Sequence, residues 1–177
     1  MNHEEMGEVL FSADQIGGRV RELGAAISRD YAGRNLVLAG VLRGAAFFLV
    51  DLARALSIPA AIDFIAISSY GPSSKAAGVV RIVKDLEEEI AGRDLLVVED
   101  IVDTGLTLGY LLRILRERGP ASLQVCTLLD RAVRRLVDHP IAYRGFEIPD
   151  KFVVGYGLDY RQRYRNLPFI AVLKPQT

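Results

Sequence analysis

The sequence predicts an α/β fold in which helices flank a mostly parallel central sheet. Three observations support this prediction: short apolar runs that suit buried strands, apolar stripes at helical spacing, and the alternation of the two along the chain. Such alternation implies right-handed crossovers and a sheet covered on both sides. Half of the 177 residues are apolar, enough to bury one sizeable core, so we expect a single domain over residues 1–177.

The first helix has a clear start signal. Ser12 followed by Gln15 is a capping-box pattern. Apolar residues then recur at steps of four, three and four from Ile16 to Ile27, which describes one face of a helix. We expect this helix to end near Gly33.

The remaining elements follow in alternation. The expected strands comprise residues 36–41, 61–68, 79–83, 95–98, 123–129, 152–156 and 169–173. One helix is expected to begin at Gly44, and another lies around residues 108–115, closed by Gly119 and Pro120. Residues 70–78 are polar and rich in helix and strand breakers, which predicts a mobile loop.

The composition argues against several classes of protein. Twenty-two basic residues balance twenty-two acidic ones, so no overall field favours nucleic acid or an anionic membrane, and a small charged ligand fits better. The only cysteine, Cys126, lies in an apolar run and is expected in the core of a protein from the reducing cytoplasm. The sequence shows neither a signal peptide nor a membrane-spanning run, so we expect a soluble cytoplasmic protein.

The end of the strand at residues 95–98 is the place where we expect a ligand. Ligands of open parallel sheets collect beyond the carboxyl ends of the strands. This strand is expected to stop at Glu99 and Asp100, and a third carboxylate follows at Asp103. Three acids therefore meet at one edge of the predicted sheet.

A phosphate-sized turn follows these acids. Thr104, Gly105 and Thr107 lead into a helix whose backbone N–H groups, together with two hydroxyl groups, suit a dianionic phosphate. Unscreened carboxylates would repel that phosphate, but ribose hydroxyl groups and a hydrated Mg²⁺ ion resolve the conflict. The pattern therefore indicates a phosphorylated ribose bound with magnesium.

A purely structural interpretation of these residues stays open. In it, Asp103 or Thr104 only caps the helix, and Glu99 and Asp100 form the solvated end of a strand. The usual nucleotide-binding signatures are absent, because the sequence contains neither a Walker A motif nor a Gly-x-Gly-x-x-Gly fingerprint.

The run at residues 95–107 resembles the phosphoribosyl pyrophosphate signature of the type I phosphoribosyltransferases; it is Leu-Leu-Val-Val-Glu-Asp-Ile-Val-Asp-Thr-Gly-Leu-Thr. By this resemblance Glu99 and Asp100 hold the ribose hydroxyl groups, directly or through Mg²⁺, and Asp103 handles the proton on purine N7. The residues that would wrap the 5'-phosphate are Asp103, Thr104, Gly105, Leu106 and Thr107. The resemblance also implies a small hood formed by N- and C-terminal segments.

The stretch at residues 145–160 closely resembles the hypoxanthine and hypoxanthine-guanine branch of this family. Phe152 can offer a ring face to a flat base, and Val153 can offer its backbone groups to the base edge. The alternative is that residues 152–154 are an ordinary core strand.

Two charged residues follow Val153 in the sequence. By the family pattern Asp159, at the purine site, contacts Mg²⁺, and Arg165 contacts pyrophosphate. The alternative for both is a plain surface ion pair.

Arg131 is a departure from the family pattern. It falls where relatives commonly place a lysine that donates a hydrogen bond to the exocyclic O6 of the purine. An arginine can donate that bond too, although its planar, bulkier group is not equivalent to an ammonium. A surface-exposed Arg131 is the alternative.

Two further segments resemble loops of the family. The turn with Arg43 and Gly44 resembles the pyrophosphate loop, in which the backbone adopts an unusual peptide geometry and Arg43 would neutralise the leaving group. The segment with Ser69 and Tyr70 resembles the flexible lid that would close over the ribose and exclude water. Simple surface loops are the alternative for both.

The resemblance runs from about Leu10 to the end of the chain and implies a purine salvage reaction. A phosphoribosyl group would pass from phosphoribosyl pyrophosphate to hypoxanthine, guanine or both, with Mg²⁺, giving IMP or GMP and pyrophosphate. We expect a homodimer or homotetramer that binds neither nucleic acid nor membrane.

Two rival functions are weighed against this enzyme. The first is a regulatory binding protein on the same scaffold that acts on RNA or DNA, for which a basic face at Arg131, Arg134 and Arg135 would serve; the neutral net charge argues against it. The second is a receiver-like domain with a phosphorylated aspartate, in which the turn at Thr104 and Gly105 would have no role.

Overall fold

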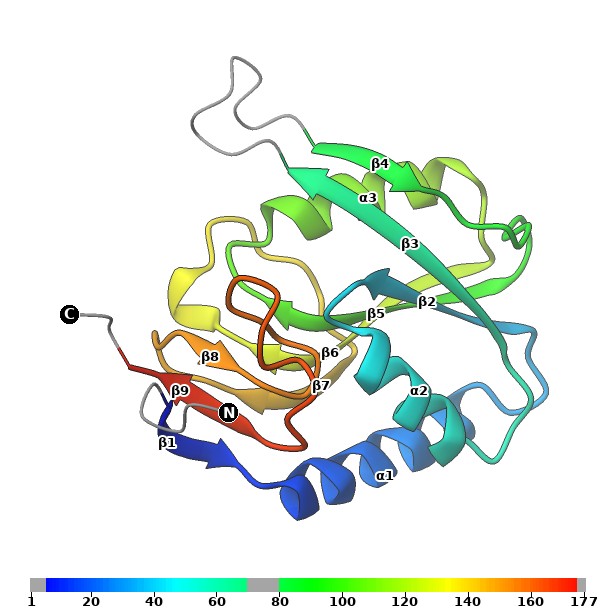
Figure 1. Ribbon diagram of the computed structural model, residues 1–177. Helices are drawn as coiled ribbons and strands as arrows, with labels where there is room; N and C mark the ends of the chain where they lie inside the picture. Colours follow the sequence, from blue (N-terminus) through cyan, green and yellow to red (C-terminus); the bar gives the residue numbers. More distant parts are fainter. Residues whose placement is uncertain (1–5, 70–79, 175–177) are drawn as a thin grey trace.

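The computed structural model describes residues 6–69 and 80–174 and contains two sheets flanked by helices (Figure 1). The strands are β1 (Met6–Phe11), β2 (Leu36–Leu42), β3 (Ala61–Ser69), β4 (Val80–Lys84), β5 (Asp94–Val102), β6 (Ser122–Asp130), β7 (Tyr143–Glu147), β8 (Val153–Val154) and β9 (Ile170–Leu173). The helices are α1 (Ala13–Asp30), α2 (Ala46–Ala55), α3 (Leu106–Glu117) and the short 3-10 helix η2 (Ala132–Arg134).

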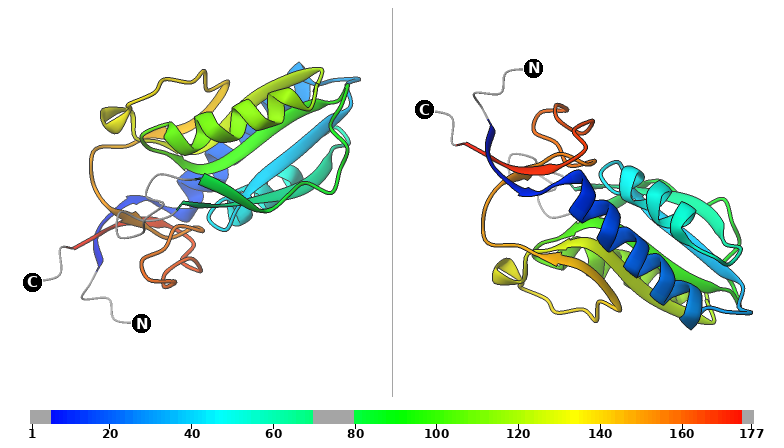
Figure 2. Two further views of the ribbon diagram at one scale, coloured as in Figure 1. Left: turned by 90° about the horizontal axis from the view of Figure 1, so that it is seen from above. Right: turned by 90° about the horizontal axis from the view of Figure 1, so that it is seen from below.

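The larger sheet has six strands in the order β4-β3-β2-β5-β6-β7. Its neighbouring strands run parallel except for β4, which is antiparallel to β3. Helices α1 and α2 pack on one face and α3 covers the other (Figure 2). The predicted α/β fold with a mostly parallel, doubly covered sheet is therefore confirmed.

Helix α1 begins as the sequence indicates. The Ser12 hydroxyl accepts from the backbone of Gln15, and the Gln15 side chain accepts from the backbone of Ser12, which completes the capping box. The predicted stripe from Ile16 to Ile27 is buried against the sheet. The helix ends at Asp30, slightly before the expected Gly33, whose φ of +74° places it in the following turn.

The smaller sheet joins the two ends of the chain. Strands β1, β9 and β8 lie side by side in that order and are antiparallel. This sheet forms the predicted small hood, and it shares a hydrophobic core with the larger sheet through residues such as Val153 and Ile170. Strands β1 and β7 were not among the elements expected from the sequence.

Two strand boundaries were predicted wrongly. Strand β5 does not stop at residue 98 but continues to Val102, where its backbone still pairs with β6. Parallel pairing uses only the main chain, so a change to acidic side chains does not end the strand. Conversely, β8 spans only Val153–Val154 of the expected 152–156, because Gly155 and Tyr156 adopt positive φ angles of 104° and 49°.

The remaining expectations concern burial and the membrane. Cys126 is fully buried in β6, as predicted for a core residue. Within residues 6–69 and 80–174, no helix is long and apolar enough to cross a membrane. The loop expected at residues 70–78 lies outside the described residues.

Candidate active site

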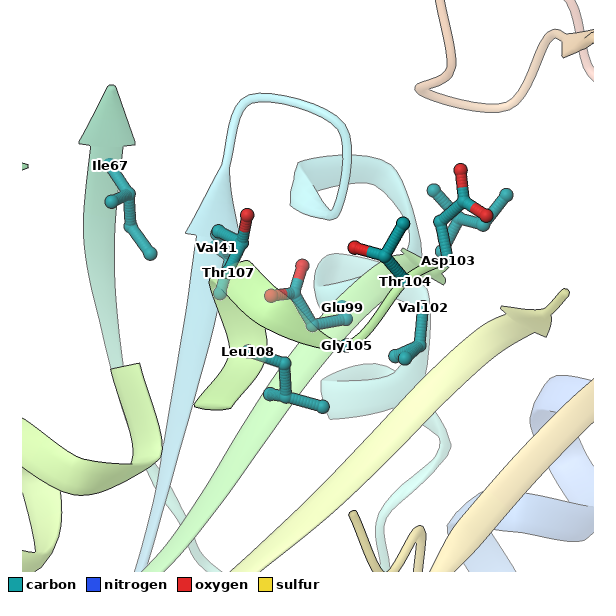
Figure 3. A pocket seen from close by; sticks show the side chains of 10 residues that line it. Val41, Ile67, Glu99, Val102, Asp103, Thr104, Gly105, Thr107 and Leu108 are labelled. Atoms are coloured by element: carbon teal, nitrogen blue, oxygen red, sulfur yellow. The ribbon is translucent and has the colours of Figure 1, made fainter. Parts of the chain in front are cut away.

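A cavity of about 220 Å³ opens where β5 turns into α3, at the carboxyl edge of the large sheet (Figure 3). It is lined by Val41, Ile67, Glu99, Ile101, Val102, Asp103, Thr104, Gly105, Thr107 and Leu108. The lining combines acids with the start of a helix. Its chemistry therefore suits a ligand that carries both hydroxyl groups and an anionic group.

The turn into α3 depends on Gly105. This residue is the N-cap of the helix, has a φ of +83°, and provides no side-chain cap. Asp103 does not occupy the N-cap position, but the Thr104 hydroxyl accepts at 3.4 Å from the N–H group of Leu106, the first helical residue, so the structure contains a capping contact from Thr104. A Cβ atom added to Gly105 would collide with the carbonyl oxygen of Val137, so the close approach of this backbone requires glycine.

Of the acid pair at the end of β5, Glu99 has no hydrogen-bond partner among the described residues, whereas Asp100 accepts from the Ile101 N–H group at 2.8 Å. Glu99 is only 7% exposed, so the solvated strand end considered above does not describe it. Burial, and then the charge of Asp100, raises the pKa of Glu99 well above its usual range. Burial also raises the pKa of Asp100 to about 6, although its contact with the Ile101 N–H group and the charge of Arg165 act in the opposite direction.

This acid pair fits part of a magnesium site. Among the residues that the structure describes, no cluster of three or more His, Cys, Asp or Glu side chains forms a complete metal cage. Two neighbouring carboxylates are nevertheless suitable oxygen ligands, because Mg²⁺ usually binds one or two carboxylates and keeps several waters. A divalent cation would also relieve the repulsion by Asp100 that contributes to the raised pKa of Glu99.

The pyrophosphate loop predicted from the sequence contacts this acid pair. The peptide bond between Leu42 and Arg43 is cis, the unusual geometry that was expected there. A Cβ atom on Gly44 would overlap the Asp100 carboxylate, and one on Gly157 would collide with the Gly44 carbonyl oxygen. The ends of β2 and β5 and the loop after β8 therefore meet at two glycines.

Arg43 and Arg165 reach the same place from different parts of the chain. The Gln162 side-chain oxygen accepts a hydrogen bond at 3.3 Å from each of them. Arg165 also forms an ion pair at 2.7 Å with Asp159, as the alternative interpretation of those two residues expects. Two guanidinium groups thus lie beside the acids, a suitable arrangement for a polyanionic group.

Arg131 lies inside the site, so the alternative of a surface-exposed side chain is wrong. Its side chain is 7% exposed, with one nitrogen 3.2 Å from Asp103 Oδ2 and another donating to the Lys151 carbonyl oxygen at 2.7 Å. The Arg131 Nε and Asp103 Oδ1 atoms are buried and have no hydrogen-bond partner within the described part of the chain. A donor and an acceptor are therefore left free at neighbouring positions.

Phe152 and Val153 differ in their surroundings. Phe152 is 53% exposed and meets the ring of Tyr160 edge-on at 5.9 Å, so it is not an ordinary core residue. Val153 is buried in β8. The Phe152 ring is thus available to a planar ligand, while the Val153 side chain supports the hood.

The comparison with known families agrees with this arrangement. The model of the phosphoribosyl transferase domain matches residues 9–161. The chain belongs to this phosphoribosyltransferase family.

Named relatives of this phosphoribosyltransferase cover nearly the whole chain. The hypoxanthine-guanine phosphoribosyltransferase of Mycobacterium tuberculosis is 51% identical over 97% of this chain and 88% of its own length. That of Bacillus subtilis is 46% identical, with 99% and 97% covered. A solved hypoxanthine phosphoribosyltransferase from Staphylococcus aureus has a TM-score of 0.93 and 45% identity, covering 99% of this chain and 97% of that one.

One predicted lid residue lies near the site of this phosphoribosyltransferase, and two features of the site were not predicted from the sequence. Ser69 is the last residue of β3, at the same edge of the sheet, whereas Tyr70 lies outside the described residues. Gln162 was not singled out from the sequence, since a lone glutamine carries no motif. The segment 135–139 was also missed as part of the site, although Arg135 was noted within a basic face.

Proposed function

We propose that this protein is a purine salvage enzyme that transfers a 5-phosphoribosyl group from phosphoribosyl pyrophosphate to hypoxanthine, guanine or both. The products would be IMP or GMP and pyrophosphate. The observation that carries the proposal is the contact of Arg131 with Asp103 beside the phosphate turn, because it joins a free donor and a free acceptor suited to a 6-oxopurine. The names of relatives that are 46% and 51% identical support the same activity.

The phosphoribosyl half of the substrate would bind at the turn into α3. The backbone N–H groups from Thr104 to Thr107, aided by two hydroxyl groups, would hold the 5'-phosphate, with Leu106 supplying its N–H at the helix start. Glu99 and Asp100 would hold the ribose hydroxyl groups and Mg²⁺. When bound, Mg²⁺ would neutralise charge on the pyrophosphate leaving group.

The leaving group would be bound by cations from two loops. Arg43, beside Gly44, and Arg165 both approach Gln162, so their charges converge on one volume. They would stabilise the pyrophosphate as negative charge develops on it. The negative charge of the nearby carboxylates would stabilise the positive charge that develops at C1 of the ribose.

The base would be held by the second half of the chain. Phe152 would stack on the purine, and the Val153 backbone would contact its edge, with Asp159 nearby as a further ligand of Mg²⁺. Asp103 would accept the N7 proton during nucleotide formation and return it in the reverse reaction. Arg131 would donate to the exocyclic O6 while its other nitrogen orients the Asp103 carboxylate.

The decisive experiment compares bases. The protein is incubated with phosphoribosyl pyrophosphate, Mg²⁺ and hypoxanthine, guanine or xanthine separately, and the release of pyrophosphate is measured against a reaction without base. We expect saturable release with hypoxanthine, guanine or both. No release with any of the three 6-oxopurines would refute the proposal, and salt-sensitive nucleic-acid binding without turnover would favour the regulatory protein instead.

We further propose that residues 1–177 act as one domain in a cytoplasmic homodimer or homotetramer, and that Ser69 and Tyr70 belong to a lid over the ribose. The shared hydrophobic core of both sheets supports the single domain. Light scattering at several protein concentrations measures the oligomeric state. A monomer at all concentrations would contradict it.

A further inference from the structure

The first backbone carbonyl groups of the phosphate turn, those of Asp103, Thr104 and Gly105, contact one segment of the chain. Residues 135–139 follow the helix η2 and lie against Asp103, Thr104 and Gly105. We call these five residues the backing segment. It contains no residue to which the proposed reaction assigns a role.

Arg135 is the most deeply placed member of the backing segment. Its side chain is 12% exposed, its Nε donates to the Asp103 carbonyl oxygen at 3.0 Å, and its terminal nitrogen pairs with the buried carboxylate of Asp130. Its aliphatic part also lies close to the position that a Cβ atom on Gly105 would occupy. One guanidinium group therefore ties the turn to β6.

The next carbonyl groups of the turn are bound by the rest of the backing segment. The Thr104 carbonyl oxygen accepts from the backbone N–H groups of Leu136 and Val137, both at 3.0 Å. The Gly105 carbonyl oxygen lies 3.1 Å from Nε2 of His139. The carbonyl groups of Asp103 and Thr104 are thus bound by the backing segment, whereas the Gly105 carbonyl oxygen also accepts from the Gly109 N–H group of α3 at 2.8 Å.

Peptide geometry determines where the N–H groups of the phosphate turn point. In a planar trans peptide the C=O and N–H groups point in opposite directions. Because the carbonyl groups of Asp103 and Thr104 are bound by the backing segment, the N–H groups of Thr104 and Gly105 point away from that segment. Those N–H groups are the donors that would bind the phosphate.

We propose that Arg135 is a positioning residue for phosphoribosyl binding, acting through the Asp103 carbonyl group to fix the N–H groups of the phosphate turn. The proposal rests on the proposed function only for the identity of the ligand. Arg135 does not touch the substrate in this scheme. Its loss should therefore weaken binding of the phosphorylated ribose much more than it slows the chemical step.

Arg144 offers a matched control. Its Nε pairs with the other oxygen of Asp130 at 2.8 Å, so it neutralises the same buried carboxylate. It donates no hydrogen bond to the phosphate turn in the part of the chain that the structure describes. Arg135→Met and Arg144→Met thus both remove a partner of Asp130, but only the first removes the support of the turn.

The experiment separates binding from turnover. For the wild type and both variants, kcat and KM for phosphoribosyl pyrophosphate are measured with Mg²⁺ and hypoxanthine, together with the melting temperature and the Kd of ribose 5-phosphate by calorimetry. Arg135→Met should raise this KM and Kd by about ten- to a hundredfold, as expected for a lost charge-assisted hydrogen bond, and change kcat much less. Arg144→Met removes an ion pair of a half-exposed side chain, so it should lower the melting temperature less and leave both constants within about twofold.

Several outcomes would overturn the proposal. One is a loss of melting temperature or kcat in Arg135→Met with unchanged KM and Kd, which would indicate a purely structural role. An equal rise of KM and Kd in Arg144→Met would assign the effect to Asp130 instead. If Arg135→Met does not fold, Arg135→Lys keeps the charge next to Asp130 and should raise both constants about three- to tenfold; no rise would refute the proposal.

The calorimetric measurement keeps this inference apart from the proposed function. Ribose 5-phosphate needs no purine to bind. If the wild type fails to turn over every 6-oxopurine but Arg135→Met still weakens ribose 5-phosphate binding, the proposed function fails and the role of Arg135 stands. If the wild type turns over a 6-oxopurine normally but Arg135→Met binds ribose 5-phosphate as tightly as the wild type, the proposed function stands and the role of Arg135 fails.

Discussion

Asp63 and Asp94 near the starts of β3 and β5 are each bound by several protein donors, whereas near the end of β5 Glu99 has none among the described residues and Asp100 accepts from the adjacent Ile101 N–H group. Asp63 is 5% exposed and Asp94 is 6% exposed, about as buried as Glu99 at 7%. Asp94 pairs with Arg34 at 2.7 Å and accepts from the Ser122 hydroxyl group at 2.6 Å. The donors to Asp63 are the backbone N–H groups of Phe64, Glu87 and Glu88, with Lys84 also close by.

The pKa of Asp63 and the pKa values of the acid pair at the end of β5 move in opposite directions. Burial acts to raise the pKa of Asp63, but the backbone donors and the charge of Lys84 outweigh it, and the pKa is lowered. Burial raises the pKa of Glu99, which has no such donors among the described residues, and that of Asp100, where the Ile101 N–H group and the charge of Arg165 do not outweigh it. Protein donors therefore outweigh burial at Asp63, and burial outweighs them at the end of β5.

The difference indicates a structural role for the acids near the strand starts and a ligand-binding role for those at the end of β5. A buried carboxylate whose lone pairs are bound by the protein stabilises the fold. A buried carboxylate that lacks partners costs stability and is retained where a ligand supplies the missing contact. Asp103 lies between these cases, because Oδ2 contacts Arg131 while Oδ1 has no partner among the described residues.

The largest effect is expected from Asp103→Asn. An amide cannot accept the N7 proton, so kcat should fall by about 10²- to 10⁴-fold, the usual contribution of a general base. Binding of ribose 5-phosphate should change little, because the backbone of the turn is unaltered. Steady-state kinetics with hypoxanthine and calorimetry with ribose 5-phosphate measure the two quantities. Turnover near the wild-type rate would remove Asp103 from the proton transfer.

The sequence predicted the acids at and just after the end of β5 better than those near the strand starts. Glu99, Asp100 and Asp103 fall in one contiguous motif beside a helix start, so local pattern was enough to find them. The partners of Asp63 come from residues 84–88, after the segment 70–79, and no local pattern indicates that contact. Long-range satisfaction of a carboxylate depends on tertiary packing, which a short motif does not encode.

The same limit explains what was missed elsewhere. Strand β1 pairs with β9 at the other end of the chain, and the backing segment contacts a turn about 30 residues earlier in the sequence. Backbone groups make most of these contacts, so residue types at these positions give no signal. The six-residue strand β1 alternates too weakly to be distinguished from a loop, with a burial pattern of two exposed residues between partly buried ones. The sequence therefore predicted the strand end that carries the acid motif, but not the segments that pack against it.

Asp63→Asn should give the largest loss of stability. The amide keeps one acceptor but loses the charge that three N–H groups and Lys84 bind, which should cost about 2 to 3 kcal/mol at pH 7. Since the folded pKa is lowered, this contribution is present above the unfolded pKa and is lost as the pH falls through the folded pKa. Urea unfolding at neutral and acidic pH measures it, with kcat as the control that should not change. Equal stability of variant and wild type at neutral pH would contradict the comparison.

Asp100→Asn should instead increase the stability of the protein at neutral pH. The folded pKa of Asp100 is raised to about 6, so the wild type loses stability as the pH rises from the unfolded pKa through that value. Without Mg²⁺ the variant should therefore be more stable by about 1 to 2 kcal/mol at pH 7, and the advantage should vanish near pH 4. The same urea experiment measures this difference. A variant that is less stable than the wild type at pH 7 would show that the Ile101 hydrogen bond and the charge of Arg165 outweigh the cost of burying the Asp100 carboxylate.

The smallest expected effect is that of Mg²⁺ on the wild type without substrate. At concentrations severalfold above its Kd, an ion that binds only the folded state should add about 1 kcal/mol. The melting temperature should rise more at pH 7.5 than at pH 5, because Asp100 must be ionised to bind the ion. Asp100→Asn should lose the rise and Asp63→Asn should keep it, since only the first removes a carboxylate of the acid pair. An equal rise in wild type and Asp100→Asn would place the ion elsewhere and would separate the raised pKa of Asp100 from any role in binding magnesium.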